Sequence, residues 1–260
     1  MSAFHTVIPA RFGSTRLPGK ALLPLAGKPM VQWVHERACA AGGPVWIATD
    51  DERIAVVARG FGAEVVMTAP THASGTDRVA EVAQRLKWDE GSIVVNAQGD
   101  EPLLPPELVR QVAGLLEAHP RAHVATLCAP IASLEVFLDP NAVKVVCDLS
   151  GRALYFSRAP MPWSRDGATA GLGSQSRYSG AQRHIGLYAY RVGALQRLAS
   201  LAPTALERIE QLEQLRALEH GFDIRVAQAC VPPGPDVNTP ADLERVSALL
   251  AGAPPGARAP

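Results

Sequence analysis

Short apolar runs alternate with longer amphipathic stretches through the first half of the chain. The runs are rich in β-branched residues, which is typical of buried strands, whereas the stretches repeat apolar positions at helical spacing. The predicted strands are His5–Pro9, Val45–Thr49, Glu64–Thr68, Ser92–Asn96 and Val124–Cys128. The predicted helices are Met30–Ala41, Glu52–Gly60, Thr76–Lys87 and Pro106–Ala118. Because strands that alternate with helices form right-handed βαβ crossovers, we expect an α/β fold with a mainly parallel central sheet flanked by helices.

The pattern changes after residue 140. Two apolar runs, Val143–Cys147 and Ala153–Ser157, flank a polar turn and predict an antiparallel hairpin. Residues 159–182 are rich in Pro, Gly, Ser and Ala and show little periodicity, and an ordered loop of that length is usually functional or interfacial. The later predicted elements are a strand at Ile185–Arg191, a helix from about Glu207 to Glu219, a strand near Ile224–Ala229 and a final helix after Asn238-Thr239-Pro240.

No internal repeat and no clean linker divides the chain. We therefore expect one domain over residues 1–252, in which residues 140–190 form an inserted subdomain. The Pro- and Gly-rich residues 253–260 are predicted to be a flexible tail.

Composition narrows the classes of partner. The 260 residues are 47% hydrophobic and carry 25 Lys and Arg against 25 Asp and Glu, so a nucleic-acid or anionic-membrane surface, which needs a basic excess, is not expected. No run approaches the roughly 18 apolar residues of a membrane span, and the segment MSAFHTVIPAR has no signal-peptide pattern. The four cysteines are scattered without a CxxC pair, which favours free thiols and a cytoplasmic location.

The segment after the first predicted strand is basic and glycine-rich. It reads PARFGSTRLPGK over residues 9–20 and places Arg11, Arg16 and Lys20 at a strand end, a combination that suits a triphosphate. It is not a Walker A motif, because five residues rather than four separate the glycine positions and Ala21 stands where that motif needs Ser or Thr. No GxGxxG follows the strand, which weakens a dinucleotide-binding interpretation. The alternative is a solvated basic loop.

The most apolar predicted strand ends in an acidic turn, NAQGDEP, over residues 96–102. Asp100 is expected at the carboxyl edge of the sheet, near the basic loop. A carboxylate beside a triphosphate is the expected anchor for Mg²⁺, which takes few protein ligands and shares substrate oxygens. Glu101 either assists Asp100 or starts the next helix. The alternative for Asp100 is a turn-forming Asp beside Gly.

Further motifs complete a recognisable set. They are LAGKPM at 25–30, THASGTDR at 71–78, NAVKVV at 141–146, LYFSRAPMPW at 154–163, RHIGLYAYR at 183–191 and LERIEQLEQLR at 206–216. Together with the basic loop and the acidic turn, these motifs span nearly the whole chain. In this full set of motifs the chain closely resembles the family of 3-deoxy-manno-octulosonate cytidylyltransferases, or CMP-Kdo synthetases. Single loop motifs are shared with other sugar-activating nucleotidyltransferases, whereas the full set is specific.

This resemblance implies a Rossmann-like nucleotidyltransferase fold and an activity. CMP would pass from CTP to 3-deoxy-D-manno-octulosonate (Kdo), with release of pyrophosphate, for lipopolysaccharide biosynthesis. The resemblance also implies Mg²⁺ as cofactor, CTP and Kdo as small-molecule partners, and a homodimer. It makes the inserted subdomain over residues 140–190 the expected region for the sugar site or for dimerisation. Two alternatives stay open: a cytidylyltransferase for another acid sugar, such as sialic acid or an amino analogue of Kdo, and a nucleotide-binding regulator without turnover.

The resemblance also implies roles for single residues. Catalysis would fall to Arg11, Lys20 and Asp100, with Asp100 holding the metal. The implied nucleotide-binding residues are Arg11, Arg16, Lys20, Ser74, Arg78 and Gln98. The implied sugar-binding residues are Gln98, Arg158, His184, Tyr188, Glu213 and Gln214.

The sugar-site residues also have structural interpretations. His184 and Tyr188 share one face of a predicted strand, which favours a site, but a lone strand histidine is often a hydrogen-bonded structural residue. Glu213 lies in a pattern typical of an amphipathic helix with a solvated face. Arg158, between a strand and a loop, could pair with a surface carboxylate.

The C-terminal segment departs from the family pattern. Where the family has a second metal-binding Asp in a Val-Asp-Thr-Pro run, this chain reads PDVNTP over residues 235–240. Either Asp236 takes the metal-binding role, since it shares a face with Asn238 in an extended segment, or Asn238 supplies a neutral oxygen. Asn238 could instead be the N-cap of the last helix.

Overall fold

A nine-stranded sheet forms the centre of the molecule. The structure is a computed structural model that describes residues 4–13, 17–167 and 174–252. The strands of the central sheet are β1 Phe4–Pro9, β4 Val45–Thr49, β5 Glu64–Met67, β6 Ile93–Asn96, β7 Val124–Pro130, β8 Lys144–Cys147, β9 Ala153–Ser157, β10 Gln182–Arg191 and β11 Ile224–Gln228. Their order is β11-β7-β10-β6-β1-β4-β5, and the hairpin β8–β9 joins through β8, which pairs with β10. A small separate sheet pairs β2 (Pro24–Leu25) with β3 (Lys28–Pro29).

One strand along this order runs opposite to all the others. β1 is parallel to β4 and β6, β4 is parallel to β5, and β7 is parallel to β11. β10 lies between β6 and β7 and is antiparallel to both. The expected α/β fold, with parallel strands, flanking helices and an antiparallel hairpin, is confirmed.

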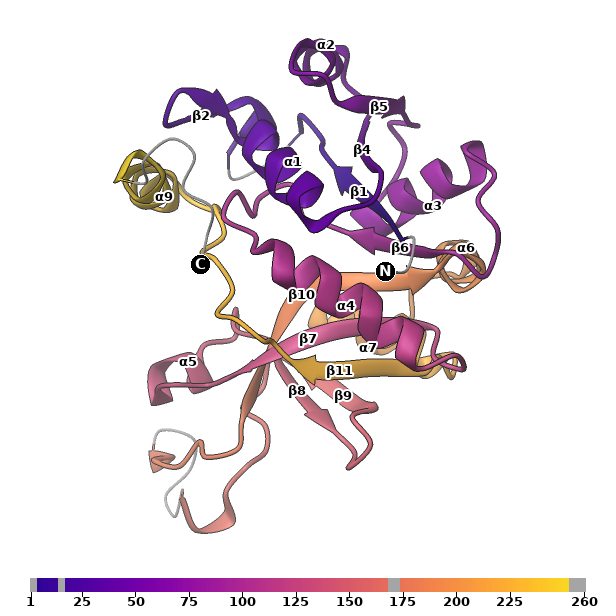
Figure 1. Cartoon of the computed structure of the whole chain (residues 1–260). Helices are drawn as coiled ribbons and strands as arrows, with labels where there is room; N and C mark the ends of the chain where they lie inside the picture. Colours follow the sequence, from indigo (N-terminus) through magenta and orange to yellow (C-terminus); the bar gives the residue numbers. More distant parts are fainter. Residues whose placement is uncertain (1–3, 14–16, 168–173, 253–260) are drawn as a thin grey trace.

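Helices cover both faces of the sheet. They are α1 Met30–Ala41, α2 Glu52–Gly60, α3 Gly75–Arg85, α4 Pro106–Ala118, α5 Leu134–Leu138, α6 Val192–Ser200, α7 Ala205–Glu210, α8 Gln214–Glu219 and α9 Pro240–Gly252. One core cluster packs α1, α2 and α4 on Ile8 and its neighbours, and another packs α3, α6 and α8 on Val7, because adjacent strand residues face opposite sides. Figure 1 shows α1 and α4 on the near side of the sheet. Among the described residues, no helix has the length and apolar character of a membrane span.

The predicted continuous helix over 207–219 is wrong. α7 and α8 are separated at Gln211, which has left-handed backbone angles of φ 52° and ψ 47°. The break lets Leu212 enter the core, where it is 7% exposed. Arg216 also reaches back to Glu207, with 2.5 Å between Nη2 and Oε1. Burial and this ion pair compensate for the left-handed backbone, which costs roughly 1–2 kcal/mol.

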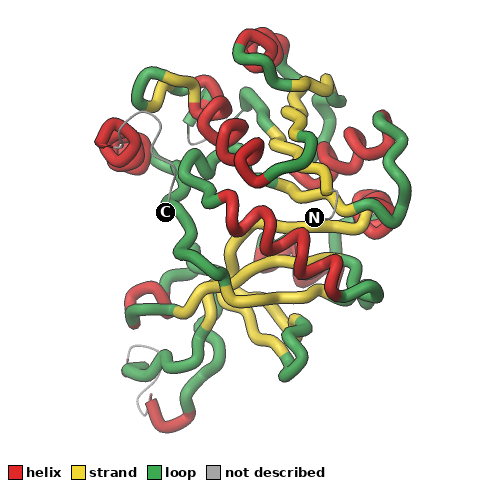
Figure 2. Tube along the Cα trace, viewed as in Figure 1, coloured by secondary structure: helices red, strands yellow, loops and turns green. Residues whose placement is uncertain are grey.

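Several short elements lacked a sequence prediction, among them α5, α6 and the small sheet β2–β3. The predicted irregular excursion between β9 and β10 contains the short 3₁₀ helix Arg165–Gly167 and, within its described residues, no strand (Figure 2). A second 3₁₀ helix, Lys20–Leu22, follows the basic loop.

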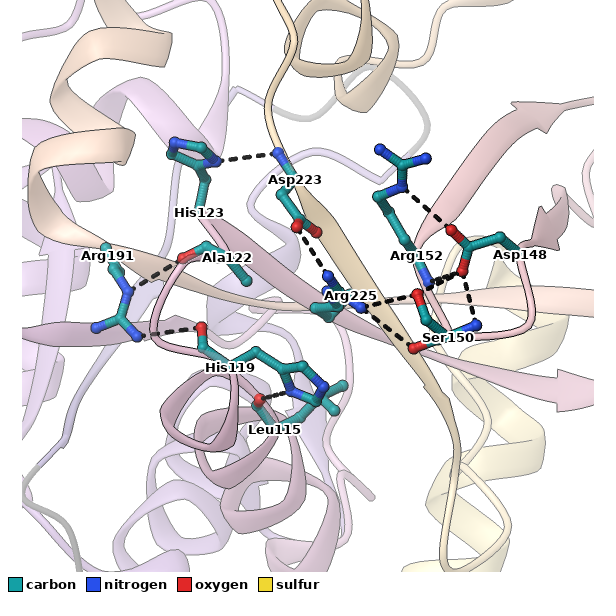
Figure 3. Close-up of polar contacts among 10 residues, drawn as sticks. All are labelled: Leu115, His119, Ala122, His123, Asp148, Ser150, Arg152, Arg191, Asp223 and Arg225. Atoms are coloured by element: carbon teal, nitrogen blue, oxygen red, sulfur yellow. Dashed lines mark hydrogen bonds and ion pairs between the residues drawn. The ribbon is translucent and has the colours of Figure 1, made fainter.

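Polar contacts attach the hairpin turn to the edge strand β11 (Figure 3). Arg225 donates to the carbonyl of Ser150 at 3.2 Å and to the carboxylate of Asp223 at 2.9 Å. The Asp148 carboxylate accepts hydrogen bonds from Ser150 and Arg152, and these bonds hold the pKa of Asp148 well below its usual value. The hairpin is therefore tied to the sheet at its tip as well as through β8.

Candidate functional site

The loops that follow β1, β5 and β6 surround a cavity of about 220 Å³, which we call the first cavity. This is the carboxyl edge of the parallel strands, where α/β folds bind ligands. The sequence-predicted residues that line it are Arg11, Lys20, Ser74, Arg78, Gln98 and Asp100. The structure therefore brings the basic loop and the acidic turn together. Arg16 lies outside the described residues.

Close backbone approaches shape the first cavity. A side chain at Gly99 would place its Cβ 2.8 Å from the carbonyl oxygen of Pro9, so only glycine allows the two loops to touch. Gly19 has a φ of 67° and closes the basic loop by donating its N–H to the carbonyl of Phe12 at 3.1 Å.

Lys20 links the basic loop to two other segments. Its side chain is 14% exposed and donates to Asp100 Oδ2 at 2.8 Å and to Asn238 Oδ1 at 3.3 Å. The N–H of Val237 donates to the carbonyl of Asp100 at 2.9 Å, which fixes the C-terminal segment beside the acidic turn. Asn238 Nδ2 donates to the carboxylate of Asp236. Three segments far apart in sequence thus converge on one ammonium group.

The N-cap interpretation of Asn238 is wrong for its side chain. Thr239 makes the capping bonds of α9, since its Oγ1 accepts from the N–H of Asp242 at 3.2 Å and its own N–H donates to the Asp242 carboxylate at 2.9 Å. The side chain of Asn238 is left to face Lys20.

The oxygen atoms beside Lys20 fit a Mg²⁺ ion by their chemistry. Asp100 offers a carboxylate and Asn238 an amide oxygen, and Mg²⁺ typically takes one or two such protein oxygens while phosphates and water supply the rest. Within residues 4–13, 17–167 and 174–252, no group of three or more His, Cys, Asp or Glu side chains could hold a metal. The protein thus offers a partial site that a bound phosphate would complete.

Carboxyl groups crowd the acidic turn, and Glu101 is therefore neutral near pH 7. Burial raises the pKa of the Glu101 carboxyl to about 8, the charges of Asp100 and Asp236 add to this effect, and Arg183 opposes it. A cation placed among these carboxylates would be electrostatically favoured.

α3 begins at the rim of the first cavity because Ser74 and Asp77 form a capping box. Ser74 Oγ accepts from the N–H of Asp77 at 3.1 Å, and the Asp77 carboxylate accepts from the N–H of Ser74 at 3.1 Å. Arg78 is 3% exposed, forms an ion pair with Asp50 at 3.2 Å and donates to Thr68 Oγ1. Arg78 therefore lines the cavity and also ties together the loops after β4 and β5.

A second cavity of about 60 Å³ shares Gln98 with the first. Its other polar lining residues are Thr76, Asn96, Tyr188, Tyr190, Glu213 and Gln214. Glu213 accepts from Ser74 Oγ at 3.0 Å and from Thr76 Oγ1 at 2.7 Å. Burial raises the pKa of Glu213 although these hydrogen bonds oppose the rise. Glu213 is thus a half-buried cavity residue rather than part of a solvated helix face.

His184 and Tyr188 lie together beside the second cavity. Their ring centroids are 5.2 Å apart, and Phe156 contacts the His184 ring edge-on at 5.0 Å. Burial, with a contribution from the charge of Arg183, lowers the pKa of His184 to about 3, so the imidazole is neutral near pH 7.

Arg158 lies apart from both cavities in this structure. Its guanidinium donates to the carbonyls of Glu210 at 2.6 Å and Pro140 at 3.0 Å, and its backbone N–H donates to the Glu210 carboxylate at 2.9 Å. Arg158 therefore fixes the end of α7 to the hairpin. Its guanidinium pairs with carbonyls, which leaves its positive charge without a carboxylate partner among the described residues.

Some cavity residues had no role assigned from the sequence. His72 lines the first cavity, and Thr76 and Tyr190 line the second. All three lie in motifs that resemble the family. The period-two spacing of Tyr188 and Tyr190 was the available signal for Tyr190, because it places both rings on one strand face.

Comparisons with known proteins agree with this geometry. The chain matches a family model described as Cytidylyltransferase over residues 6–224. It is 56% identical over 250 residues to the 3-deoxy-manno-octulosonate cytidylyltransferase of Thioalkalivibrio sulfidiphilus (strain HL-EbGR7), covering 95% of this chain and 99% of that protein. The chain belongs to the 3-deoxy-manno-octulosonate cytidylyltransferase family. The resemblance inferred from the motifs is confirmed.

Other members of this cytidylyltransferase family are similarly close. The relative from Halorhodospira halophila (strain DSM 244 / SL1) is 53% identical over 249 residues, covering 95% of this chain and 97% of that protein. A solved structure of a CMP:2-keto-3-deoxy-manno-octonic acid synthetase complexed with CTP matches with a TM-score of 0.86 and 43% identity, over 96% of this chain and 99% of that chain. A cytidylyltransferase from Leptospira borgpetersenii serovar Hardjo-bovis (strain JB197) has a TM-score of 0.62 at 18% identity over 96% of this chain and 87% of that chain, which shows a shared fold.

Proposed function

We propose that the protein transfers CMP from CTP to Kdo, giving CMP-Kdo and pyrophosphate for lipopolysaccharide biosynthesis. The proposal rests chiefly on one observation: Arg11, Lys20 and Asp100 line a single cavity. It is supported by 56% identity to a curated 3-deoxy-manno-octulosonate cytidylyltransferase across 95% of the chain.

The proposed reaction is a direct displacement at phosphorus. The anomeric hydroxyl oxygen of the sugar acid forms a bond to the α-phosphorus of CTP, the bond from that phosphorus to the β-phosphate oxygen breaks, and pyrophosphate leaves. The hydroxyl proton passes to solvent. Because the nucleophile belongs to the substrate, no protein nucleophile is required.

Charge neutralisation is the proposed task of the basic loop. Arg11 and Lys20 would hold the triphosphate and stabilise the negative charge on the departing pyrophosphate, with Arg16 as a helper. Ser74, Arg78 and Gln98 would help to form the nucleotide pocket. Bound Mg²⁺ would supply Lewis-acid stabilisation of the phosphate oxygens.

Asp100 is the proposed principal metal ligand, with Asn238 beside it. Asn238 is favoured over Asp236 because its Oδ1 and Asp100 Oδ2 reach the same ammonium group of Lys20. Asp236 accepts from the Asn238 amide nitrogen and would hold its oxygen toward the cavity. Lys20 would then shift from these oxygens to the triphosphate.

The second cavity is the proposed sugar site. Gln98, His184, Tyr188, Glu213 and Gln214 provide donors and acceptors for a polyhydroxylated ligand. Arg158 is the proposed cation for the sugar carboxylate. It would reach that carboxylate only if its bonds to the carbonyls of Pro140 and Glu210 rearranged.

The cellular location and the oligomeric state of the protein are also proposals. All four cysteines are free thiols, which supports a cytoplasmic location. A homodimer formed through the 140–190 region is supported by exposed Leu149, Leu154 and Trp163. Trp163 does not pack internally in this structure, and Leu172 lies outside the described residues.

Pyrophosphate release from CTP and Mg²⁺, with and without Kdo, tests the function. We expect release only with Kdo, and CMP-Kdo as the product by mass spectrometry. Sialic acid and the amino analogue of Kdo belong in the same panel. Release with one of these but not with Kdo would reassign the substrate. CTP binding without pyrophosphate release at any Mg²⁺ concentration would instead support a nucleotide-binding regulator without turnover.

A further inference from the structure

The segment between β5 and α3 is a thin wall between two spaces. On one side, His72, Ser74 and Gly75 line the first cavity. On the other side is an open groove of about 790 Å³ against α3 and α6. His72 lines both spaces, so one side chain separates them. The wall could therefore move away from the cavity unless something holds it.

Glu81, on α3 and outside the first cavity, holds this wall. Its Oε2 accepts from the N–H of Ala69 at 2.8 Å and pairs with Nε2 of His72, and its Oε1 pairs with Arg85 at 2.5 Å. The Glu81 side chain is 14% exposed. Burial acts to raise the pKa of Glu81, but the bonds from Ala69, His72 and Arg85 hold it below its usual value, so the anchor is ionised near pH 7.

The two ends of the wall depend on different anchors. Ser74 is held by Asp77 and Glu213, which belong to the α3 cap and the second cavity. Among the described residues, Glu81 is the side chain that bonds both Ala69 and His72 and so ties residues 69–73 to α3. No other described partner would replace Glu81 if its carboxylate were lost.

We propose that Glu81 is a positioning residue for the nucleotide, which acts by holding Ala69 and His72 at the edge of the first cavity. This inference rests on the proposed cytidylyltransferase function. Without Glu81 the 69–73 wall would relax toward the groove and His72 would leave the cavity rim. CTP would then bind more weakly, whereas the groups around the reacting phosphorus would stay in place.

A set of three variants separates the contacts of Glu81. Glu81→Ala removes every contact, and Glu81→Gln keeps an acceptor for Ala69 but loses the charge beside His72. Arg85→Gln removes only the outer ion pair. We expect KM for CTP to rise roughly tenfold in Glu81→Ala, as for a lost charge-assisted hydrogen bond, and less in Glu81→Gln, with kcat within about twofold of wild type. Arg85→Gln should match wild type.

Glu107→Gln is the matched control. Glu107 also pairs with an arginine on its own helix, Arg110, at 3.3 Å, but contacts neither cavity. It should leave KM for CTP unchanged. An unchanged KM in both Glu81 variants, or an equal rise in Glu107→Gln, would overturn the proposal.

Hydrogen–deuterium exchange of the full-length protein gives a second readout that does not need turnover. Peptides that cover residues 68–75 should exchange faster in Glu81→Gln than in wild type, and CTP titration by calorimetry should show weaker binding. Unchanged exchange there would overturn the inference. If wild type binds CTP but releases no pyrophosphate with any acid sugar, the proposed function fails, while exchange and CTP affinity still decide the role of Glu81.

Discussion

The hydrogen bonds around His184 determine which ring nitrogen carries its proton. Thr126 Oγ1 lies 2.9 Å from His184 Nε2, 3.0 Å from the carbonyl of Ile185 and 2.8 Å from that of Leu187. A hydroxyl has one proton, and the carbonyls can only accept, so Thr126 donates to a carbonyl and accepts from His184. The proton of His184 is therefore on Nε2, and Nδ1 is left as an acceptor, which suits the proposed contact with a sugar hydroxyl.

Acid should destabilise the wild-type protein more than His184→Gln. The folded pKa of His184 is lowered to about 3, whereas an unfolded histidine titrates near 6.5. Below pH 6.5 the unfolded chain gains a proton that the folded chain lacks, so this residue removes stability as the pH falls toward 3. Melting temperatures of both proteins at several pH values between 5 and 8 would test this. A difference between the two melting temperatures that does not vary with pH would contradict this prediction.

Loss of the Asp100 carboxylate should abolish turnover while CTP still binds. Asp100→Asn keeps the size of the side chain but removes the charge that faces Lys20 and the proposed metal. We expect kcat to fall at least roughly 10²–10³-fold. Pyrophosphate release and calorimetric CTP titration measure the two effects separately. Near-normal turnover would refute the metal role of Asp100.

The dependence of turnover on Mg²⁺ concentration tests whether Asn238 or Asp236 is the second metal ligand. Asn238→Ala should raise the half-saturating Mg²⁺ concentration at least about tenfold, whereas Asp236→Asn, which changes only the partner of Asn238, should raise it less. The reverse order would make Asp236 the ligand.

At the scale of elements, the α7–α8 break is stabilised by a buried ion pair. Glu207 and Arg216 have side chains that are 12% and 8% exposed, and Glu207 also accepts from the N–H of Thr204 at 3.1 Å. Burial opposes ionisation of Glu207, but the bonds from Arg216 and Thr204 hold its pKa below the usual value. The pair therefore stabilises the fold above the unfolded pKa of glutamate and loses this effect as the pH falls below it.

Glu207→Ala should be strongly destabilising because it leaves Arg216 buried without its partner. We expect a loss of about 3–5 kcal/mol in the free energy of unfolding. Glu52→Ala is the control, since the Glu52–Arg59 pair is 65% and 49% exposed and should cost less than about 1 kcal/mol. Urea unfolding of both variants measures the difference, and equal losses would contradict the assignment.

The elements with a strong local pattern could be predicted from sequence, and those decided by distant packing could not. The bounds of α1, α2, α4 and β4 agree with the prediction because their periodicity is uninterrupted. The apolar spacing over 206–215 also continues without interruption, so nothing local marks the break at Gln211. The sequence does not reveal that β10 is antiparallel to its neighbours. Side chains alternate between the two faces of a sheet with a period of two in parallel and in antiparallel strands alike.

In the candidate site, too, local patterns could be predicted from the sequence and contacts between distant elements could not. Arg11, Lys20 and Asp100 could be placed together because parallel strands bring their carboxyl-end loops to one edge. The position of His72 beside Glu81, and the contact of Thr76 with Glu213, depend on how helices pack, which spacing does not encode. Arg158 could be located in the sequence, but its carbonyl partners could not.

At the scale of the whole molecule, the hairpin offers an unpaired apolar surface. Leu149 and Leu154 are 110% and 54% exposed, although they lie on an ordered turn and strand. Arg225 ties the turn to β11 (Figure 3). The side chains of Leu149 and Leu154 are therefore presented on a fixed backbone. That arrangement suits contact with a second copy of the chain.

Leu154→Glu should therefore convert the proposed homodimer to a monomer. A charge placed in an apolar interface would be buried without a partner. Light scattering after gel filtration measures the mass, and Val56→Glu is the control because Val56 is 59% exposed on α2, outside the 140–190 region. An unchanged dimer mass in Leu154→Glu would exclude this surface.

The strand β10 also limits where insertions and deletions can occur in the chain. The strand pairs with β6 and β7 at the centre of the sheet and with β8 at its start, so one continuous segment carries both the core register and the position of His184 and Tyr188. A single codon inserted within Gln182–Arg191 would turn all later side chains of the strand to the opposite face. Natural insertions and deletions should therefore accumulate before residue 182, where the described part of the preceding excursion has little regular secondary structure, and spare the strand itself.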